Sequence, residues 1–434
     1  MSEVALTPAL DLTAFKAMGS AVSRRVMVQP ETTPSFSLGT ATQDIYFALP
    51  SGKTSMIMGQ NSYIVFDCIM VGGTTTTTAS GFCNGSASSA IRGLELIVGN
   101  TSVELLDRYN VFANLIEDFQ SASRSGTLGE ILGACGSSAG IKMPSNFITS
   151  QRVAIPIYSS IIGTLANQGC PAVDGIRLKL TFETLAIATQ EQGASGAIGT
   201  TAVASCAISN LNLVMDYLDI DPVVHSQLIQ ESGGVFKTHG VGVSNFSTSL
   251  GASSGSQLSI LIPARYSSVK NYFTIFRNQA VLGANVALHN STGSRYNPAI
   301  RNYAYRIDGR QYPSIPVICH NGTTSQSGEV MAEVLKCFDS ANSQVFDCVF
   351  SKANFLFDNA TPVNQGAFVI GVDFEQEAGS GARVVSGKDT NSNNTFLEAQ
   401  LNATNPVALQ IDTYACYDLI LEVNMMTGEV SVSK

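Results

Sequence analysis

The chain alternates between short runs in which every second residue is apolar and longer runs of small polar residues. Alternation is clearest at residues 175–182, where Ile176, Leu178 and Leu180 are separated by polar side chains. This period of two is typical of a strand that buries one face in a core. Many short strands between polar loops predict an all-β protein. Other short apolar runs lie at residues 35–38, 44–50, 62–71, 91–98, 152–158, 210–219, 258–263, 272–277 and 414–423.

Helical spacing is much rarer than strand spacing. Apolar residues three and four apart predict a helix over about residues 103–120, with Glu117 and Asp118 on its wet side. A weaker pattern predicts a short amphipathic helix within residues 4–24. A parallel α/β fold would need a helix between most strands, and the sequence does not provide them.

The second half of the chain opens with the same kinds of run as the first. Each half begins with a polar run that contains one Phe, continues with a strand that ends in Pro, and then has an aromatic strand. These runs lie at residues 35–38, 44–50 and 62–71 in the first half and at 243–250, 258–263 and 272–277 in the second. We therefore predict two consecutive antiparallel, eight-stranded jelly rolls, with a few short helices in the loops. The predicted divisions are an N-terminal arm at residues 1–34, a first jelly roll at 35–222 and a second at 223–434.

Composition narrows the class of function. Only 13% of residues are charged, 44% are hydrophobic, and the net charge is −9. An acidic chain without a basic arm does not have the positive charge that binds the phosphate backbone of nucleic acids, so we expect no specific nucleic-acid binding. No apolar run reaches the roughly 18 residues that span a bilayer, and the N-terminus does not have the pattern of a signal peptide.

Metal and cofactor chemistry is not indicated. The nine cysteines include no C-x-x-C pair and mostly sit in apolar runs, as Cys68 does, so we expect reduced, buried thiols. The four histidines show no metal-ligand spacing, and His239 is assigned to a loop. We predict no metal site and no cofactor.

Catalytic motifs are present only in a weak form. G-x-S-x-G occurs at residues 136–140 and 251–255, both times in Gly/Ser-rich loops rather than at a strand-to-helix turn. Asp373, Glu375 and Glu377 could perform acid/base work on a sugar. Alternation along a strand explains these three carboxylates more simply, as the solvent-facing side of the strand. Since no motif of the sequence indicates a catalytic site, we predict that the protein is not an enzyme.

One stretch combines aromatic and basic side chains. It contains Tyr303, Tyr305, Arg306, Arg310 and Tyr312. Such a mixture could stack on single-stranded nucleic acid, or it could form a protein contact, because Tyr and Arg are favoured at interfaces. The acidic chain favours the protein contact, so these five residues are the candidate interface patch.

The order of several motifs resembles the double jelly-roll major capsid proteins of polinton-like viruses, virophages and their relatives. The resemblance rests on residues 153–163 and 176–182 in the first half, and on 305–313, 386–391 and 417–423 in the second. It runs from about residue 35 to the C-terminus. Each motif alone is loose, and their order carries the resemblance.

The resemblance implies a structural protein of the virion shell, assembled inside the host cell. Members form homotrimers whose six lobes make a pseudo-hexagonal capsomer, and capsomers tile an icosahedral capsid. Expected partners are other copies, neighbouring capsomers, and minor capsid or penton proteins. We expect the arm, with Leu12, Phe15 and Met18, on the inner face, against neighbours or an internal membrane. The rival is a host-attachment or carbohydrate-binding protein of the same sandwich class.

Overall fold

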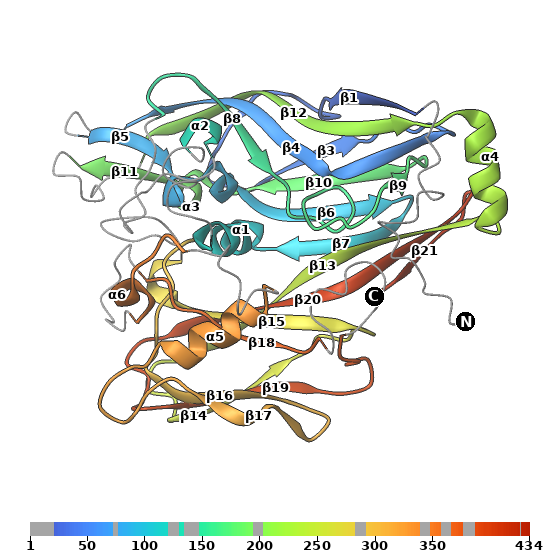
Figure 1. Cartoon of the computed structure of the whole chain (residues 1–434). Coiled ribbons are helices and arrows are strands. Elements are labelled where there is room, and N and C mark those ends of the chain that lie inside the picture. Colours follow the sequence, from blue (N-terminus) through green and yellow to red (C-terminus); the bar gives the residue numbers. More distant parts are fainter. Residues whose placement is uncertain are drawn as a thin grey trace, which may run out of the picture.

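The chain folds into two β sandwiches that pack against each other (Figure 1). The strands pair antiparallel throughout the named sheets, which confirms the predicted all-β class. The computed structural model describes residues 21–72, 77–119, 130–133, 147–193, 203–282, 292–338, 348–356, 366–375, 387–425 and 427–434.

The first sandwich contains two main sheets. One has the order β1 (Val22–Val28), β12 (Ser205–Asp219), β4 (Ser55–Val71) and β8 (Gln151–Pro156), with β2 (Phe36–Ser37) on β12 and β9 (Cys170–Pro171) on β4. The other has the order β3 (Gln43–Ala48), β10 (Ile176–Phe182), β6 (Ile91–Val98) and β7 (Thr101–Asp107). A separate pair joins β5 (Thr77–Phe82) to β11 (Thr189–Gly193).

The second sandwich is built in the same way. One sheet has the order β13 (Val235–Leu250), β20 (Leu409–Asn424), β15 (Val269–Asn278) and β18 (Ile370–Asp373), with β21 (Val430–Ser433) on β20. The other has the order β14 (Gln257–Ile262), β19 (Thr395–Leu401), β16 (Ile300–Ile307) and β17 (Arg310–Ile318).

Both halves share one strand order. If the main strands of each half are numbered one to eight along the chain, with β1 and β2 together as the first, the sheets read 1-8-3-6 and 2-7-4-5. This is the jelly-roll arrangement, repeated. The prediction of a double jelly roll is confirmed. Helix α4 (Pro222–Glu231) connects the two halves.

The remaining helices are short and lie in loops. Helices α1 (Tyr109–Asp118) and α5 (Gly328–Lys336) occupy equivalent places, because each follows the fifth strand of its half. The others are η1 (Cys83–Gly85), η2 (Ala87–Ala90), α2 (Glu130–Leu132), α3 (Leu185–Ala188), η4 (Gln279–Val281) and α6 (Lys352–Phe355).

The helix predicted over residues 103–120 is only partly correct. Residues up to Asp107 belong to strand β7, and α1 begins after Arg108, whose φ of 54° interrupts the extended chain. Pairing of β7 with β6 outweighs the helical spacing of these apolar residues. Glu117 and Asp118 are buried rather than exposed, because the second half of the chain covers α1.

The arm predicted at residues 1–34 also needs correction. From Val22 onward it forms strand β1, which pairs with β12 in the first jelly roll. Leu12, Phe15 and Met18 lie outside the described residues. Helix α4 lies at one end of the molecule, and helices α2, α3 and α6 lie at the other (Figure 1). Val22 pairs with Asp219, just before α4, so the chain enters the first jelly roll at the α4 end.

Candidate assembly surfaces

The two jelly rolls meet at a buried joint, defined here as the contact of β7, α1 and residues 157–169 with the outer face of sheet β13-β20-β15-β18. The Tyr414 hydroxyl of β20 donates to the Arg108 carbonyl at 3.1 Å, and its ring centroid lies 5.3 Å from that of Phe112 in α1. Alternate residues of β20 from Gln410 to Asp418 are buried. The central strand β20 is therefore covered on both faces over this stretch.

Charged groups from both halves are sealed inside the joint. Asp412 is completely buried, lies 2.6 Å from Nη2 of Arg277, and approaches Nε of Arg108 at 3.4 Å. Burial acts to raise the pKa of Asp412, but the two guanidinium groups outweigh it and the pKa is lowered. Asp118 of α1 pairs with Arg295, which is 1% exposed, at 2.5 Å. These ion pairs fix one jelly roll on the other.

A buried polar cluster of the first jelly roll lies where residues 157–164 approach β13. The Glu104 carboxylate is completely buried and accepts hydrogen bonds from the Ser159 hydroxyl at 2.7 Å and the Ser160 hydroxyl at 2.9 Å. Burial raises the pKa of Glu104. A Cβ at Gly240 would lie 1.8 Å from the Ser160 carbonyl oxygen, so the close approach of the backbones requires glycine there.

His239, which the sequence assigned to a loop, lies in β13 within this joint. Its Nε2 is 2.8 Å from Asp418, and its Nδ1 is 3.2 Å from the Asn167 side chain of the first half. The Ser268 hydroxyl also donates to Asp418. Burial acts to raise the pKa of Asp418, but the hydrogen bonds of His239 and Ser268 prevail and lower it. The arrangement is structural, because each group has a partner within the chain.

Among the described residues, the equivalent sheet of the first jelly roll, β1-β12-β4-β8, is covered only in part on its outer face, where Val65 and Val214 are buried and other residues are exposed. We call this surface the open sheet face. Ile69 and Val71 of β4 are 41% and 55% exposed, and Met27 of β1 is 49% exposed. Side chains alternate along β4, and Cys68 points into the core. Ile69 and Val71 therefore point to the outer side of the sheet. The face combines these apolar groups with polar ones, including the Arg152–Asp67 pair at 3.1 Å.

A second open surface lies on the second jelly roll, where α5 contacts β17. We call it the α5–β17 side. Ile315 is 75% exposed and Ile318 is 51% exposed, and the Ile318 amide donates to Glu329 of α5 at 3.1 Å. Only Val330 and Val334 of α5 are buried. The helix therefore covers its own sandwich with one face and presents the other to solvent.

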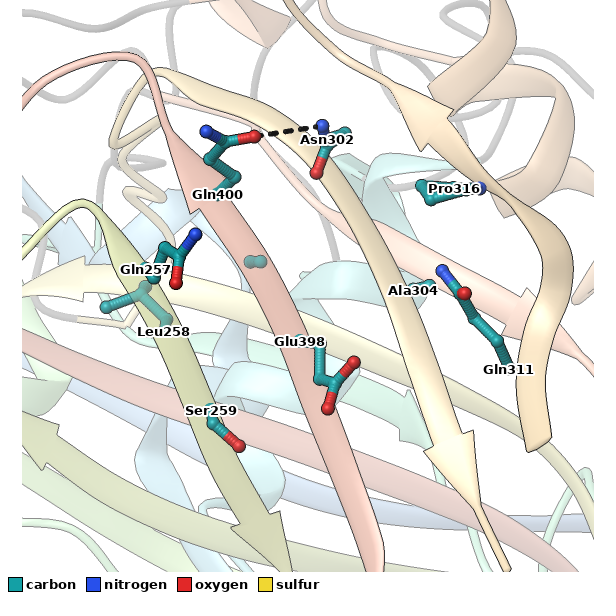
Figure 2. Close-up of a pocket in the computed structure, with 10 residues that line it drawn as sticks. Gln257, Leu258, Ser259, Asn302, Ala304, Gln311, Pro316, Glu398 and Gln400 are labelled. Atoms are coloured by element: carbon teal, nitrogen blue, oxygen red, sulfur yellow. Dashed lines mark hydrogen bonds between the residues drawn. The ribbon is translucent and has the colours of Figure 1, made fainter. Parts of the chain in front are cut away.

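A third surface is a shallow hollow on the outer face of sheet β14-β19-β16-β17 (Figure 2). Its volume is about 520 Å³, and the Asn302 amide donates to Gln400 at 3.3 Å across its floor. Amide groups dominate, since alternate residues of each strand point outward. The polar lining residues are Gln257, Ser259, Asn302, Gln311, Glu398 and Gln400.

The candidate interface patch is not one surface. Tyr303 and Tyr305 are completely buried, so their assignment to an interface is wrong. The Tyr303 hydroxyl donates to the Gly371 carbonyl at 2.8 Å, and the Tyr305 hydroxyl to Thr274 at 2.9 Å. Alternation along β16 turns both rings into the core, and the sequence does not reveal which face of this strand is inward.

The other three residues of the patch remain accessible to different extents. Arg306 pairs with Glu398 at 2.6 Å on the outer face, and Arg310 is exposed. Tyr312 is partly buried, with its ring centroid 5.6 Å from that of Phe374.

Of the carboxylates that the sequence singled out, the structure describes Asp373 and Glu375. Glu375 is not part of a solvated face, because it pairs with Lys270 at 2.8 Å and its side chain is 5% exposed. Glu377 lies outside the described residues. The described cysteines are free thiols, and all except Cys348 are buried, as predicted.

The described part of the chain has neither a metal-binding cluster nor a membrane-spanning helix. No group of three or more His, Cys, Asp or Glu side chains there could hold a metal ion. None of its helices has the length and apolar character needed to cross a bilayer.

Comparison with known proteins gives a match in structure but not in sequence. No protein-family model and no curated protein matches the chain. A chain of the PBCV-1 virus capsid is similar, with 12% identity and a TM-score of 0.60 over 96% of this chain and 97% of that one. The faustovirus major capsid protein has 9% identity and a TM-score of 0.57 over 92% and 90%.

A third solved structure, the mavirus major capsid protein, has 10% identity and a TM-score of 0.52, covering 94% of this chain and 90% of that one. At sequence identities this low, the structural similarity establishes the fold alone. The coverage of more than 90% of the chain shows that both halves belong to the similar region. The chain therefore has the double jelly-roll fold of these viral capsid proteins.

Proposed function

We propose that the chain is a major capsid protein, which forms homotrimeric, pseudo-hexagonal capsomers in the shell of an icosahedral virion. The observation that carries the proposal is the pair of jelly rolls with one strand order, which match viral capsid proteins over nearly their whole length. Two similar lobes in a fixed arrangement give six lobes in a trimer. Six similar lobes can tile a hexagonal lattice.

The role is structural rather than catalytic. Self-association would bury the apolar groups that the single chain exposes on the open sheet face and the α5–β17 side. An obligate interface of this kind exceeds about 2,000 Å² and is held mainly by apolar contact. Contacts between capsomers must form later and reversibly, so they should be smaller.

The α4 end of the molecule is proposed to face the interior of the shell. The described chain begins there, opposite Asp219, and most of the loop helices lie at the other end (Figure 1). The preceding segment, with Leu12, Phe15 and Met18, would then contact neighbouring capsomers or an internal membrane. Minor capsid or penton proteins would complete the shell.

Deletion of residues 1–20 tests this orientation, because it leaves β1 intact. Trimers should still form, and closed shells should not. Intact shells from the deleted protein, seen by electron microscopy, would remove the arm from the assembly mechanism.

Light scattering after size exclusion tests the main proposal. We expect a mass of three chains and, at high concentration, hexagonal arrays or shells in electron micrographs. A stable monomer or a pentamer would overturn the proposal.

The second candidate function is glycan binding by a host-attachment protein, favoured by the amide-lined hollow in Figure 2. Amide side chains suit sugar hydroxyl groups because they both donate and accept hydrogen bonds. A glycan array separates the two functions. Binding that is lost in Asn302→Ala and Gln400→Ala, in a protein that remains monomeric, would favour attachment over capsid assembly.

A further inference from the structure

The hollow of Figure 2 lies among rows of outward side chains that cross sheet β14-β19-β16-β17. Every second residue of a strand points outward, and outward residues that pair across strands form one row. In the middle row, Glu398 lies between the small side chains of Ser259 and Ala304, so the sheet is hollowed on both sides of this carboxylate. The row on one side consists of amides. They are Gln257, Gln400 and Asn302.

The row on the other side of the hollow is partly apolar. Leu261 is 48% exposed and pairs with Phe396, whose ring is partly buried. The Arg306 guanidinium lies over this ring, 5.1 Å from its centroid. A ligand in the hollow therefore meets amide groups on one side and apolar carbon on the other. A pyranose ring suits both, because its hydroxyl groups extend from the edge of the ring and its C–H groups lie on the two faces.

The polar groups of the hollow keep hydrogen-bonding capacity for a ligand. Within the described chain, the side chains of Gln257, Ser259 and Gln311 have no hydrogen-bond partner. The Glu398 carboxylate accepts from Nε of Arg306 through Oε1 at 2.6 Å, and its Oε2 has no partner among the described residues. An ionised carboxylate oxygen only accepts hydrogen bonds, so Oε2 selects a donor such as a sugar hydroxyl.

The charges around the hollow favour an uncharged ligand. Of the described residues that line it, Glu398 alone carries a charge. Arg306 is already paired with this carboxylate, and the whole chain has a net charge of −9. A sugar acid would meet negative charge without a free cation to balance it. The site should therefore discriminate in favour of neutral sugars.

We propose that the hollow binds neutral saccharides through their hydroxyl groups and that the assembled shell uses it to attach to glycans. Glycan binding is then not an alternative to shell formation, because one chain does both. A monosaccharide of about 12 non-hydrogen atoms binds with a Kd on the order of 1 mM at ordinary ligand efficiency. Repetition of so weak a site over a shell raises the apparent affinity by roughly 10²–10⁴. The attachment role therefore rests on the proposed function.

The counterpart sheet of the first jelly roll, β3-β10-β6-β7, serves as an internal comparison. Its outward side chains include Lys179, whose Nζ lies 3.1 Å from Asp44 and 3.7 Å from Glu95. These charged groups already satisfy one another, so this face has less to offer a ligand than the amide row. The inference therefore places the sugar site on the second jelly roll alone.

Ligand-observed nuclear magnetic resonance titration of the trimer tests the site. The neutral probes are the methyl glycosides of glucose, galactose, mannose and N-acetylglucosamine, and the acidic probes are those of glucuronic acid and N-acetylneuraminic acid. At least one neutral probe should bind with a Kd on the order of 1 mM, and the acidic probes should bind at least about tenfold more weakly, because Glu398 repels them.

The variant Ser259→Leu fills the hollow beside Glu398 and should weaken binding of the neutral probe at least about tenfold. Ser259 is exposed, so the folded chain accommodates the larger side chain. The matched control is Ala48→Leu, which enlarges an exposed side chain on β3, the counterpart strand of the first jelly roll. It should bind like the wild type. Far-ultraviolet circular dichroism should be unchanged in both variants.

A second measurement tests the attachment role. Shells or arrays of the wild type are passed over a surface coated with the neutral probe that binds best. They should bind at least about 10² times more tightly than isolated trimers. Arrays of Ser259→Leu should not attach.

The inference is overturned if the trimeric wild type binds none of the neutral probes, if the acidic probes bind equally well, or if Ser259→Leu binds like the wild type. Equal loss of binding in Ala48→Leu, or arrays that bind no more tightly than trimers, would also overturn it. In each of these cases a trimeric wild type leaves the proposed function standing. A monomeric wild type instead overturns the proposed function, and the attachment role with it.

Discussion

Helices α1 and α5 occupy the same place in two jelly rolls, yet their surroundings differ completely. Helix α1 is enclosed, and its Asp118 makes a buried ion pair with Arg295. Helix α5 buries two residues, and its Glu333–Lys336 pair is partly exposed to solvent. The difference shows that burial of this helix is decided by what docks on it and not by the fold of its own sandwich.

The sheets beneath the helices differ in the same sense. The charges on the outer face of β13-β20-β15-β18 are buried, whereas the open sheet face presents isoleucine, valine and methionine beside partly exposed charges such as the Arg152–Asp67 pair. Buried charges are tolerated only where their partners are held in place. At the joint both partners belong to one continuous chain, which holds them together. In the proposed assembly the open sheet face first exists in water and later meets another copy, and such a face gains more from moderate apolar exposure than from buried charges.

The largest expected effect comes from breaking the ion pair on α1. Asp118→Ala leaves the Arg295 guanidinium buried without this carboxylate, which should cost about 3–5 kcal/mol of unfolding free energy. The matched change on α5, Glu333→Ala, removes a partly exposed pair and should cost no more than about 0.5 kcal/mol. Urea unfolding measures both. Equal losses would contradict the contrast between the helices.

A smaller loss is expected from widening the joint. Gly240→Ala places a methyl group against the Ser160 carbonyl and should cost about 1–3 kcal/mol, because the two backbones must separate. Gly251→Ala is the control, since no atom lies within 4 Å of its added Cβ. Thermal unfolding compares the two variants. A neutral Gly240→Ala would mean that the halves are not in close contact there.

The pH dependence should show two opposite contributions from the joint. The pKa of Glu104 is raised by burial, so its contribution to stability is fully present below about pH 4 and is lost as the pH rises toward the raised value. The pKa values of Asp412 and Asp418 are lowered, so their contribution is present above about pH 4 and is lost as the pH falls through the lowered values.

The variant Glu104→Gln isolates the first contribution. Its stability relative to the wild type should be greatest at pH 7 and should decline toward pH 4, because the penalty for burying Glu104 disappears as the unfolded chain also becomes protonated. Denaturant midpoints over this range test the sign. A difference that does not change with pH would show that Glu104 is ionised without penalty.

The smallest expected effect is that of salt on the assembled protein. If the open sheet face and the α5–β17 side form an apolar contact, raising NaCl from about 0.1 to 1 M should leave the trimer mass unchanged, although this salt shortens the screening length about threefold. Light scattering at both salt concentrations tests this. Dissociation in high salt would show that ion pairs hold the copies together.

Local pattern predicted the strands well because alternation reports one buried face directly. Residues 176–182 form β10, with Leu178 and Leu180 buried and Arg177 exposed, as expected. The predicted start of α1 is too early because Leu105 and Leu106 satisfy strand pairing as well as helical spacing. Tyr303 was placed on the surface because its neighbours are arginines, although the same alternation turns it inward.

The amino-acid sequence by itself determined a charge-poor chain of many strands, arranged twice in the same way, because period and composition are local properties. Tertiary structure alone decided which of the equivalent surfaces are covered. Docking of the first jelly roll on the second brings Arg108 and Asp118 to Asp412 and Arg295, about 180 to 300 residues away in the chain. Contacts between residues so far apart in the chain depend on the geometry of the whole fold, and a local sequence pattern cannot predict that geometry.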